Sequence, residues 1–155
     1  MKTEIGQKAP SFTLPDTENN SVSLENFKGK NVLLLFFPLA FTGTCTAELC
    51  AMRDDIASYN NANAQVFGLS VDSRFVLAKF REEQKLNFPL LSDFNKVVST
   101  AYNAIYDDFI GMKGVSKRSA FIIDKEGILR YAEVLEKASD LPDFIAIKKV
   151  LAGLK

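Results

Sequence analysis

The stretch from Val32 to Cys45, which reads VLLLFFPLAFTGTC, decides how this chain folds. Residues 32–37 are a continuous apolar run, as expected for a β-strand that is buried on both faces. Pro38 fixes its own φ angle and has no N–H group, so it ends the strand. Residues 46–59 form a helix-like segment. Cys45 is therefore expected where a buried strand passes into the N-terminus of a helix.

This position favours the thiolate form of Cys45. The N–H groups at a helix N-terminus have no partners within the helix and favour an anion, and the thiolate is the reactive form of cysteine. A free thiol is only about 3% thiolate at pH 7, and raising that fraction to about 90% requires roughly 3.4 kcal/mol. A helix terminus supplies about 0.3–1 kcal/mol, or about 2 kcal/mol in favourable burial. We therefore expect a cation nearby.

Four other residues close to Cys45 carry groups that could take part in chemistry at its sulfur. Thr42, three residues earlier, can fold its hydroxyl back over the sulfur in a tight turn, and Pro38 can shield one side of the pocket. Glu48, three residues later, lies on the same helical face and can hold an arginine in position. Cys50 is the only other cysteine of the chain and a candidate redox partner.

The pattern P-x-x-x-T-x-x-C at residues 38–45, followed by Glu48, resembles the active-site motif of the peroxiredoxins. Residues 36–43, FFPLAFTG, are particularly similar to the one-cysteine AhpE-like group. Cys50, at the fifth position after Cys45, instead has the pattern of the bacterioferritin-comigratory (PrxQ-like) group.

The resemblance covers nearly the whole chain. Residues 6–12, GQKAPSF, are similar to the opening of the family, and residues 88–93, FPLLSD, to its middle segment. Residues 118–124, RSAFIID, match the late strand that carries the family's catalytic arginine. By that match Arg118 is the expected cation, and periodicity alone would not select it from the arginines present.

The resemblance implies a thiol peroxidase with no metal and no organic cofactor. Its Cys45 thiolate would attack a hydroperoxide and become a sulfenic acid, while Thr42 and Arg118 hold the peroxide oxygens. Pro38 would protect the sulfenate from over-oxidation, and Glu48 would orient Arg118. Hydrogen peroxide and small alkyl hydroperoxides are the implied substrates, and thioredoxin or a similar dithiol protein is the implied electron donor.

Cys50 is expected to resolve the sulfenic acid by forming a disulfide with Cys45 of the same chain. In an intact α-helix the Cα atoms of residues five apart lie about 8.7 Å apart, beyond the reach of a disulfide at about 7 Å. The first turns of the helix must therefore unwind. The alternative is that Cys50 is a core residue and an external thiol resolves, as in the AhpE-like group.

Other interpretations of these residues remain open. Cysteine often behaves as a small buried hydrophobe, Thr42 could be only a turn residue, Glu48 a first-turn acid and Arg118 a solvated strand charge. Two other functions also remain open. A thiol–disulfide oxidoreductase would normally carry Cys-x-x-Cys, and a non-enzymatic peroxide sensor would be oxidised once and recycle slowly.

The composition indicates one soluble domain over residues 1–155, long enough for a single core. Its 19 basic and 19 acidic residues give no net charge, and without a long basic run they give no support to nucleic-acid or anionic-membrane binding. The chain has no histidine, which excludes a cysteine–histidine dyad and almost all zinc sites.

We also expect a cytoplasmic protein. Residues 1–6, MKTEIG, are not a secretory signal, and no apolar run is long enough to span a bilayer. Because the chain has only two cysteines and no secretory signal, we expect a reducing compartment. A disulfide there is transient and catalytic more often than structural. The large rings of the family use C-terminal extensions, and this chain ends at Lys155 after its last predicted helix. We therefore expect a monomer or a weak homodimer through the loops around Phe41 and the helix that follows Cys45.

The order of elements predicts an α/β fold with a mixed central sheet, flanking helices and an N-terminal β-hairpin. The thioredoxin-like fold of the peroxiredoxins is consistent with this order. The hairpin is expected at residues 11–14 and 21–23, with a helical turn at 24–27. The other strands are expected at residues 32–37, 65–71, 88–91, 117–123 and 128–135. The helices are expected at residues 46–59, 74–85, 96–102 and 141–151.

Overall fold

The computed structural model describes residues 4–154, so the first half of the stretch 1–6 lies outside the described residues. A five-stranded mixed sheet with the order β5-β4-β3-β6-β7 forms its centre. Its strands are β3 (Asn31–Phe36), β4 (Ala64–Ser70), β5 (Leu90–Ser92), β6 (Ser119–Ile123) and β7 (Leu129–Val134). β3 pairs in parallel with β4 and antiparallel with β6.

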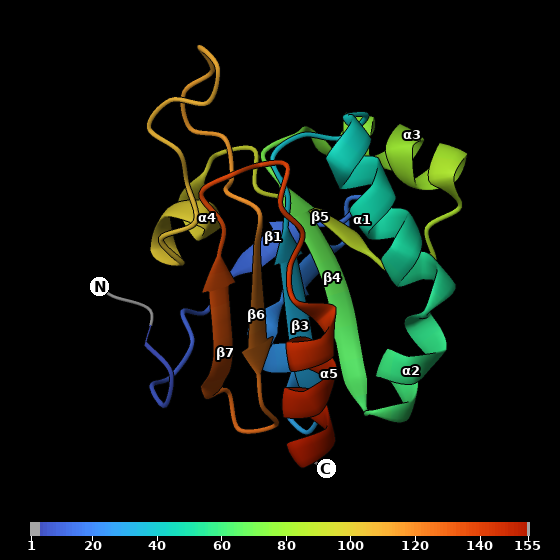
Figure 1. The fold of residues 1–155 in the computed structure, drawn as a ribbon, viewed down its shortest axis with the longest axis vertical. Helices are drawn as coiled ribbons and strands as arrows, with labels where there is room; N and C mark the ends of the chain where they lie inside the picture. Colours follow the sequence, from blue (N-terminus) through green and yellow to red (C-terminus); the bar gives the residue numbers. More distant parts are fainter. Residues whose placement is uncertain (1–3, 155) are drawn as a thin grey trace.

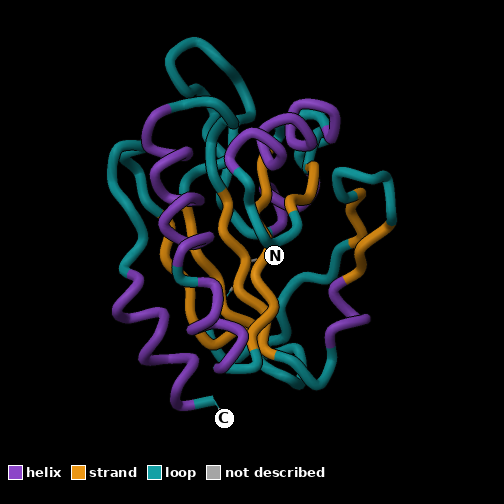
Figure 2. The backbone as a smooth tube through the Cα atoms, turned by 90° about the vertical axis from the view of Figure 1, so that its right-hand side faces the viewer, coloured by secondary structure: helices purple, strands orange, loops and turns teal. Residues whose placement is uncertain are grey.

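Two layers cover the opposite faces of this sheet (Figure 1). One layer contains the helices α1 (Gly43–Asp54), α2 (Ile56–Asn61), α3 (Arg74–Gln84) and α5 (Phe144–Gly153). The other contains the hairpin of β1 (Thr13–Pro15) and β2 (Ser21–Ser23), the 3-10 turn η1 (Leu24–Phe27) and α4 (Val97–Ala101). Figure 2 shows the sheet between α5 on one side and the hairpin on the other.

Alternate side chains of β3 belong to two different cores. Leu33 and Leu35 pack with the helices α1, α2, α3 and α5, whereas Leu34 and Phe36 pack with the hairpin and α4. Every residue of β3 is buried, which explains why residues 32–36 are continuously apolar instead of alternating. The predicted mixed sheet, its flanking helices and the N-terminal hairpin are confirmed. No helix within residues 4–154 has the length and hydrophobicity needed to cross a membrane.

The helix predicted at residues 46–59 was placed wrongly. It begins at Gly43 and breaks at Asp55, after which α2 follows. Thr42 has an extended backbone, and its carbonyl accepts the first helical N–H, that of Thr46, at 3.0 Å. Cys45 therefore lies inside the first turn of the helix instead of just before it.

The last helix also begins later than the predicted residue 141. Asp143 caps it by accepting the N–H of Ala146 at 3.0 Å, so α5 begins at Phe144 and continues to Gly153. The other predicted strands and helices agree with the structure to within two residues at each end.

The strand register brings distant residues to the carboxyl end of β3. The pairing of β3 with β6 places Phe36 opposite Ser119, so Arg118 lies beside the loop that follows β3. The parallel pairing with β4 places Phe36 opposite Leu69, which brings the residues after β4 to the same loop. The segment between α4 and β6 projects beyond this edge of the sheet (Figure 1).

Candidate active site

Cys45 lines a pocket of about 300 Å³ at this edge of the sheet. The residue is only 1% exposed, so a substrate reaches its sulfur through the pocket. Cys45 is the third residue of α1 and belongs to the first turn, whose N–H groups have no partner within the helix. The pocket wall also includes Pro38, Thr42 and Arg118, together with three apolar residues of the projecting segment, Phe109, Ile110 and Met112.

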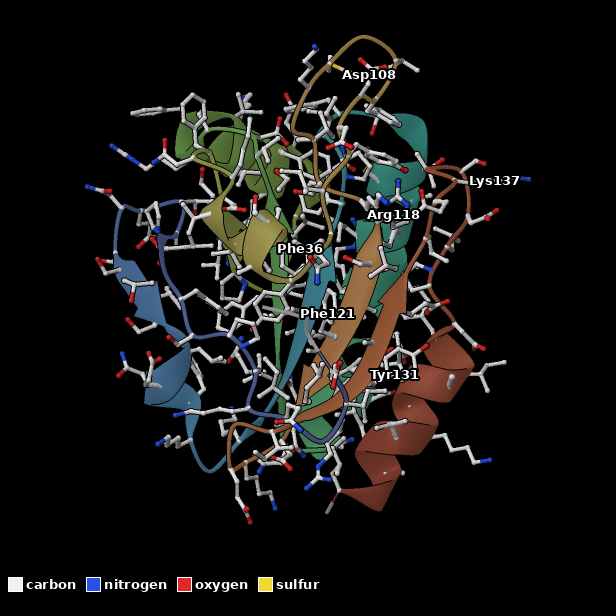
Figure 3. The ribbon with its side chains drawn as sticks, turned by 90° about the vertical axis from the view of Figure 1, so that its left-hand side faces the viewer. Phe36, Asp108, Arg118, Phe121, Tyr131 and Lys137 are labelled. Carbon is white, nitrogen blue, oxygen red and sulfur yellow. The ribbon has the colours of Figure 1, made fainter. Side chains whose placement is uncertain are left out.

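Arg118 brings a positive charge into contact with this sulfur. Its Nη2 donates a hydrogen bond to Cys45 Sγ at 3.1 Å, and its side chain is 1% exposed. Figure 3 shows Arg118 at the end of β6, beside α1 and below the projecting segment that carries Asp108. A guanidinium in contact with the sulfur can stabilise negative charge that develops there during a reaction.

Two groups hold the guanidinium of Arg118 in place. Its Nη1 donates to Glu48 Oε1 at 2.5 Å, and its Nε and Nη2 donate to the carbonyl of Ala138 at 3.1 and 3.0 Å. Burial alone would lower the pKa of Arg118, but Glu48 and Cys45 together raise it above its ordinary value. Arg118 therefore stays charged, and hydrogen bonds on both edges fix the plane of its guanidinium.

Glu48 competes with Cys45 for this single cation. The Glu48 side chain is fully buried, and its Oε2 has no hydrogen-bond partner among residues 4–154. Burial raises the pKa of Glu48 from 4.5 to about 7, and the attraction of Arg118 opposes this rise only in part. Two anions beside one guanidinium would bury a net negative charge, which is unfavourable in a low dielectric. Burial therefore favours a proton on Glu48.

Thr42 lines the pocket, and a hydrogen bond fixes the direction of its hydroxyl hydrogen. Its hydroxyl donates a hydrogen bond to the carbonyl of Leu39 at 2.7 Å, and its side chain does not cap α1. The hydrogen of the hydroxyl is therefore occupied, while the oxygen keeps lone pairs that can accept a hydrogen bond. Pro38, which is buried, lines the same pocket.

Cys50 lies on another side of α1. Both cysteines are free, and the thiol of Cys50 donates to Gln84 Oε1 in α3 at 3.4 Å. Arg53 Nη1 also donates to the backbone carbonyl of Gln84, at 2.5 Å. In the intact helix Cys45 thus faces Arg118, the residue just before β6, whereas Cys50 faces α3.

The structure thus brings Pro38, Thr42, Cys45, Glu48 and Arg118 together and leaves Cys50 apart. Sequence reasoning missed the carbonyl of Ala138, because a backbone carbonyl has no residue-type signature. It also missed the apolar wall of the pocket. That wall is carried by a tight turn in which the backbones of Phe109 and Met112 exchange two hydrogen bonds, and the segment has no periodic pattern that would mark it.

Comparisons with known proteins show what the whole chain is similar to. Residues 5–132 match the AhpC/TSA family. The chain is 39% identical over 133 residues to alkyl hydroperoxide reductase E of Mycobacterium tuberculosis, a match that covers 84% of each chain. It is similar to the crystal structure of peroxidoxin BcpB from Mycobacterium tuberculosis, with a TM-score of 0.83 and 29% identity over 98% of this chain and 96% of that one. A peroxiredoxin-like protein from Aquifex aeolicus has the same fold, with a TM-score of 0.90 and 21% identity over 100% of this chain and 90% of that one.

Proposed function

This chain belongs to the AhpC/TSA family, the peroxiredoxins, and is a thiol peroxidase; from this premise we propose that Cys45 is the thiol that reduces the peroxide. The observation that carries the proposal is the 3.1 Å contact between Arg118 Nη2 and Cys45 Sγ inside the pocket. Cys50 does not line this pocket.

The reaction begins with the Cys45 thiolate in line with the O–O bond of a hydroperoxide. An electron pair of the sulfur forms a bond to the terminal oxygen, and the O–O bond breaks. The sulfur is oxidised to a sulfenic acid, because the attacked oxygen keeps its hydrogen, and the peroxide is reduced. The other oxygen leaves as an alkoxide or hydroxide and takes up one proton to become an alcohol or water.

Thr42 and Arg118 position the peroxide and stabilise the oxygen that leaves. The Thr42 oxygen accepts the O–H of the peroxide, since its own hydrogen is bound to Leu39. A guanidinium has five N–H donors: one from Nε and one from Nη2 bind Ala138, one from Nη2 binds Cys45 and one from Nη1 binds Glu48. Within the part of the chain that the structure describes, one N–H of Nη1 is left for the leaving oxygen. A preorganised donor of this kind contributes about 10²–10³-fold in rate.

The remaining steps of the cycle form part of the same proposal. Pro38 shields the sulfenate of Cys45, Glu48 orients Arg118, and Cys50 then resolves the sulfenic acid as an intrachain disulfide. Hydrogen peroxide and small alkyl hydroperoxides are the substrates, and thioredoxin or a similar dithiol protein returns the electrons. The protein acts in a reducing, cytoplasmic setting as one domain, a monomer or a weak homodimer, with no metal and no organic cofactor.

Peroxide consumption with thioredoxin and its reductase tests this proposal. Wild type should turn over many times, Cys45→Ser should be inactive, and Cys50→Ser should be oxidised once and then stop. A Cys45→Ser variant with wild-type turnover would contradict the assignment of the reacting thiol. Oxidation of wild type without repeated turnover with any dithiol reductant would favour a peroxide sensor instead of a peroxidase.

A further inference from the structure

Asp72 joins the loop at residues 37–42 to the ends of two neighbouring strands. Its Oδ2 accepts the N–H of Ala40 at 2.8 Å and the hydroxyl of Ser70, the last residue of β4, at 2.6 Å. Its backbone carbonyl accepts the hydroxyl of Ser92, the last residue of β5, at 2.6 Å. Through Asp72 the carboxyl ends of β4 and β5 therefore hold the loop that follows β3.

One peptide plane connects Asp72 to Thr42. The N–H of Ala40 and the carbonyl of Leu39 belong to the same peptide unit, and in a planar trans peptide these two groups point in opposite directions. The N–H is bound to Asp72, and the carbonyl accepts the Thr42 hydroxyl at 2.7 Å. Asp72 thus fixes the carbonyl that binds the hydroxyl hydrogen of Thr42.

The loop needs such an anchor because its conformation is strained. Phe41, between Ala40 and Thr42, has a φ angle of 65°, which is uncommon for a bulky residue. Its ring packs edge-on against Phe80, with 5.1 Å between ring centroids. A hydrogen bond to a carboxylate is roughly twice as strong as one between neutral groups, and it also polarises the peptide that receives the Thr42 hydroxyl.

We propose that Asp72 is a positioning residue for peroxide reduction, which acts by holding the Leu39–Ala40 peptide so that the Thr42 oxygen is free to accept the peroxide O–H. The inference rests on the proposed function, in which Thr42 binds the substrate. Without Asp72 the peptide can turn, and the Thr42 hydroxyl then loses its acceptor. In part of the molecules the hydroxyl hydrogen of Thr42 then points into the pocket. There it meets the peroxide O–H, and the Thr42 oxygen no longer accepts that hydrogen.

Two reactions of the same thiol separate positioning from reactivity. On a Cys50→Ser background, the rate of Cys45 oxidation by hydrogen peroxide depends on Thr42, whereas alkylation by iodoacetamide requires only the thiolate. Asp72→Ala should slow oxidation by about 10- to 100-fold, as a small misplacement of a binding group does. Alkylation should stay within about twofold of its original rate. Asp72→Asn, whose Oδ1 can still accept the Ala40 N–H, should regain most of the loss.

A double-mutant cycle with Thr42→Val decides whether Asp72 acts through Thr42. In the Thr42→Val background, Asp72→Ala should change the oxidation rate by less than about twofold, because coupled residues are not additive. Equal slowing by Asp72→Ala in both backgrounds, or equal slowing of oxidation and alkylation, would overturn the inference. If Asp72→Ala does not fold, as judged by circular dichroism, Asp72→Asn replaces it, and its smaller loss should also vanish with Thr42→Val.

The failure of this inference differs from the failure of the proposed function. If Thr42→Val alone leaves oxidation unchanged, Thr42 does not bind the peroxide, and both assignments fall together. If Thr42→Val slows oxidation but the Asp72 variants do not, only the role of Asp72 is wrong. Ser70→Ala is the matched control, because it removes the hydroxyl that donates to Asp72 Oδ2 and accepts the Asp72 N–H but keeps the carboxylate that binds the Ala40 N–H. It should slow oxidation less than Asp72→Ala does, and equal slowing would count against the inference.

Discussion

Replacing Glu48 with glutamine tests the balance of charge in the site. Glutamine keeps the shape of the side chain and an oxygen for Arg118, but it cannot ionise. The ordinary pKa of 4.5 applies to Glu48 in the unfolded chain, whereas burial raises the pKa to about 7 in the folded protein. Between these two pH values the folded protein holds a proton that the unfolded chain has released.

The stability of the wild type therefore falls as the pH rises through this window. The contribution of protonated Glu48 is fully present below pH 4.5 and is lost as the pH passes about 7. A pKa difference of one corresponds to about 1.4 kcal/mol, so the rise from 4.5 to about 7 corresponds to about 3 kcal/mol. The Glu48→Gln variant lacks this proton and should lack this slope.

Urea unfolding of both proteins, reduced and followed by far-ultraviolet circular dichroism, measures the difference. The free energy of unfolding of wild type minus that of Glu48→Gln should fall by about 3 kcal/mol between about pH 4 and about pH 8. Glu82→Gln, a change at an exposed acid of α3, is the control and should show no such fall. A difference that stays constant with pH would mean that Glu48 is ionised in the folded protein, and the reasoning on burial would be refuted.

Three further predictions concern the reaction and self-association. Arg118→Ala should slow Cys45 oxidation by about 10²–10³-fold, with part regained in Arg118→Lys; unchanged rates by rapid quench and mass spectrometry would contradict its role. After one equivalent of peroxide, peptide mapping should find a Cys45–Cys50 disulfide, because Cys50 is the only other thiol. A lasting Cys45 sulfenic acid would mean that an external thiol resolves. Phe41, 49% exposed, should support a weak dimer that Phe41→Ser dissociates in sedimentation velocity; a wild-type decamer at micromolar concentration would exclude this.

The part of the site that lies within one strand–turn–helix unit could be predicted from the sequence. Pro38, Thr42, Cys45 and Glu48 are close in sequence, so short-range geometry largely determines their relative positions. The error within this unit was the start of α1, because glycine and threonine at residues 43–44 are poor helix formers. Their helical conformation is instead decided by the extended backbone and the accepting carbonyl of Thr42.

Groups that reach the site through strand pairing could not be predicted from spacing. Arg118 was found only through its resemblance to a family motif, since its place depends on the register of β3 with β6. Asp72 and Ala138 gave no signal, because each acts on the site through a backbone group, the N–H of Ala40 in one case and its own carbonyl in the other. A loop acid and an alanine are common residues, and their partners are invisible in a sequence.

The state of Glu48 shows why the chemistry of a site is harder to predict than its members. A glutamate near the start of a helix is ordinarily solvated and ionised at neutral pH. Here it is fully buried, and its desolvation depends on every group that covers it, most of which are remote in sequence. The same burial removes the solvent that would screen Arg118 from Glu48 and Cys45. Spacing therefore predicts which groups can react, whereas packing decides how strongly they act on one another.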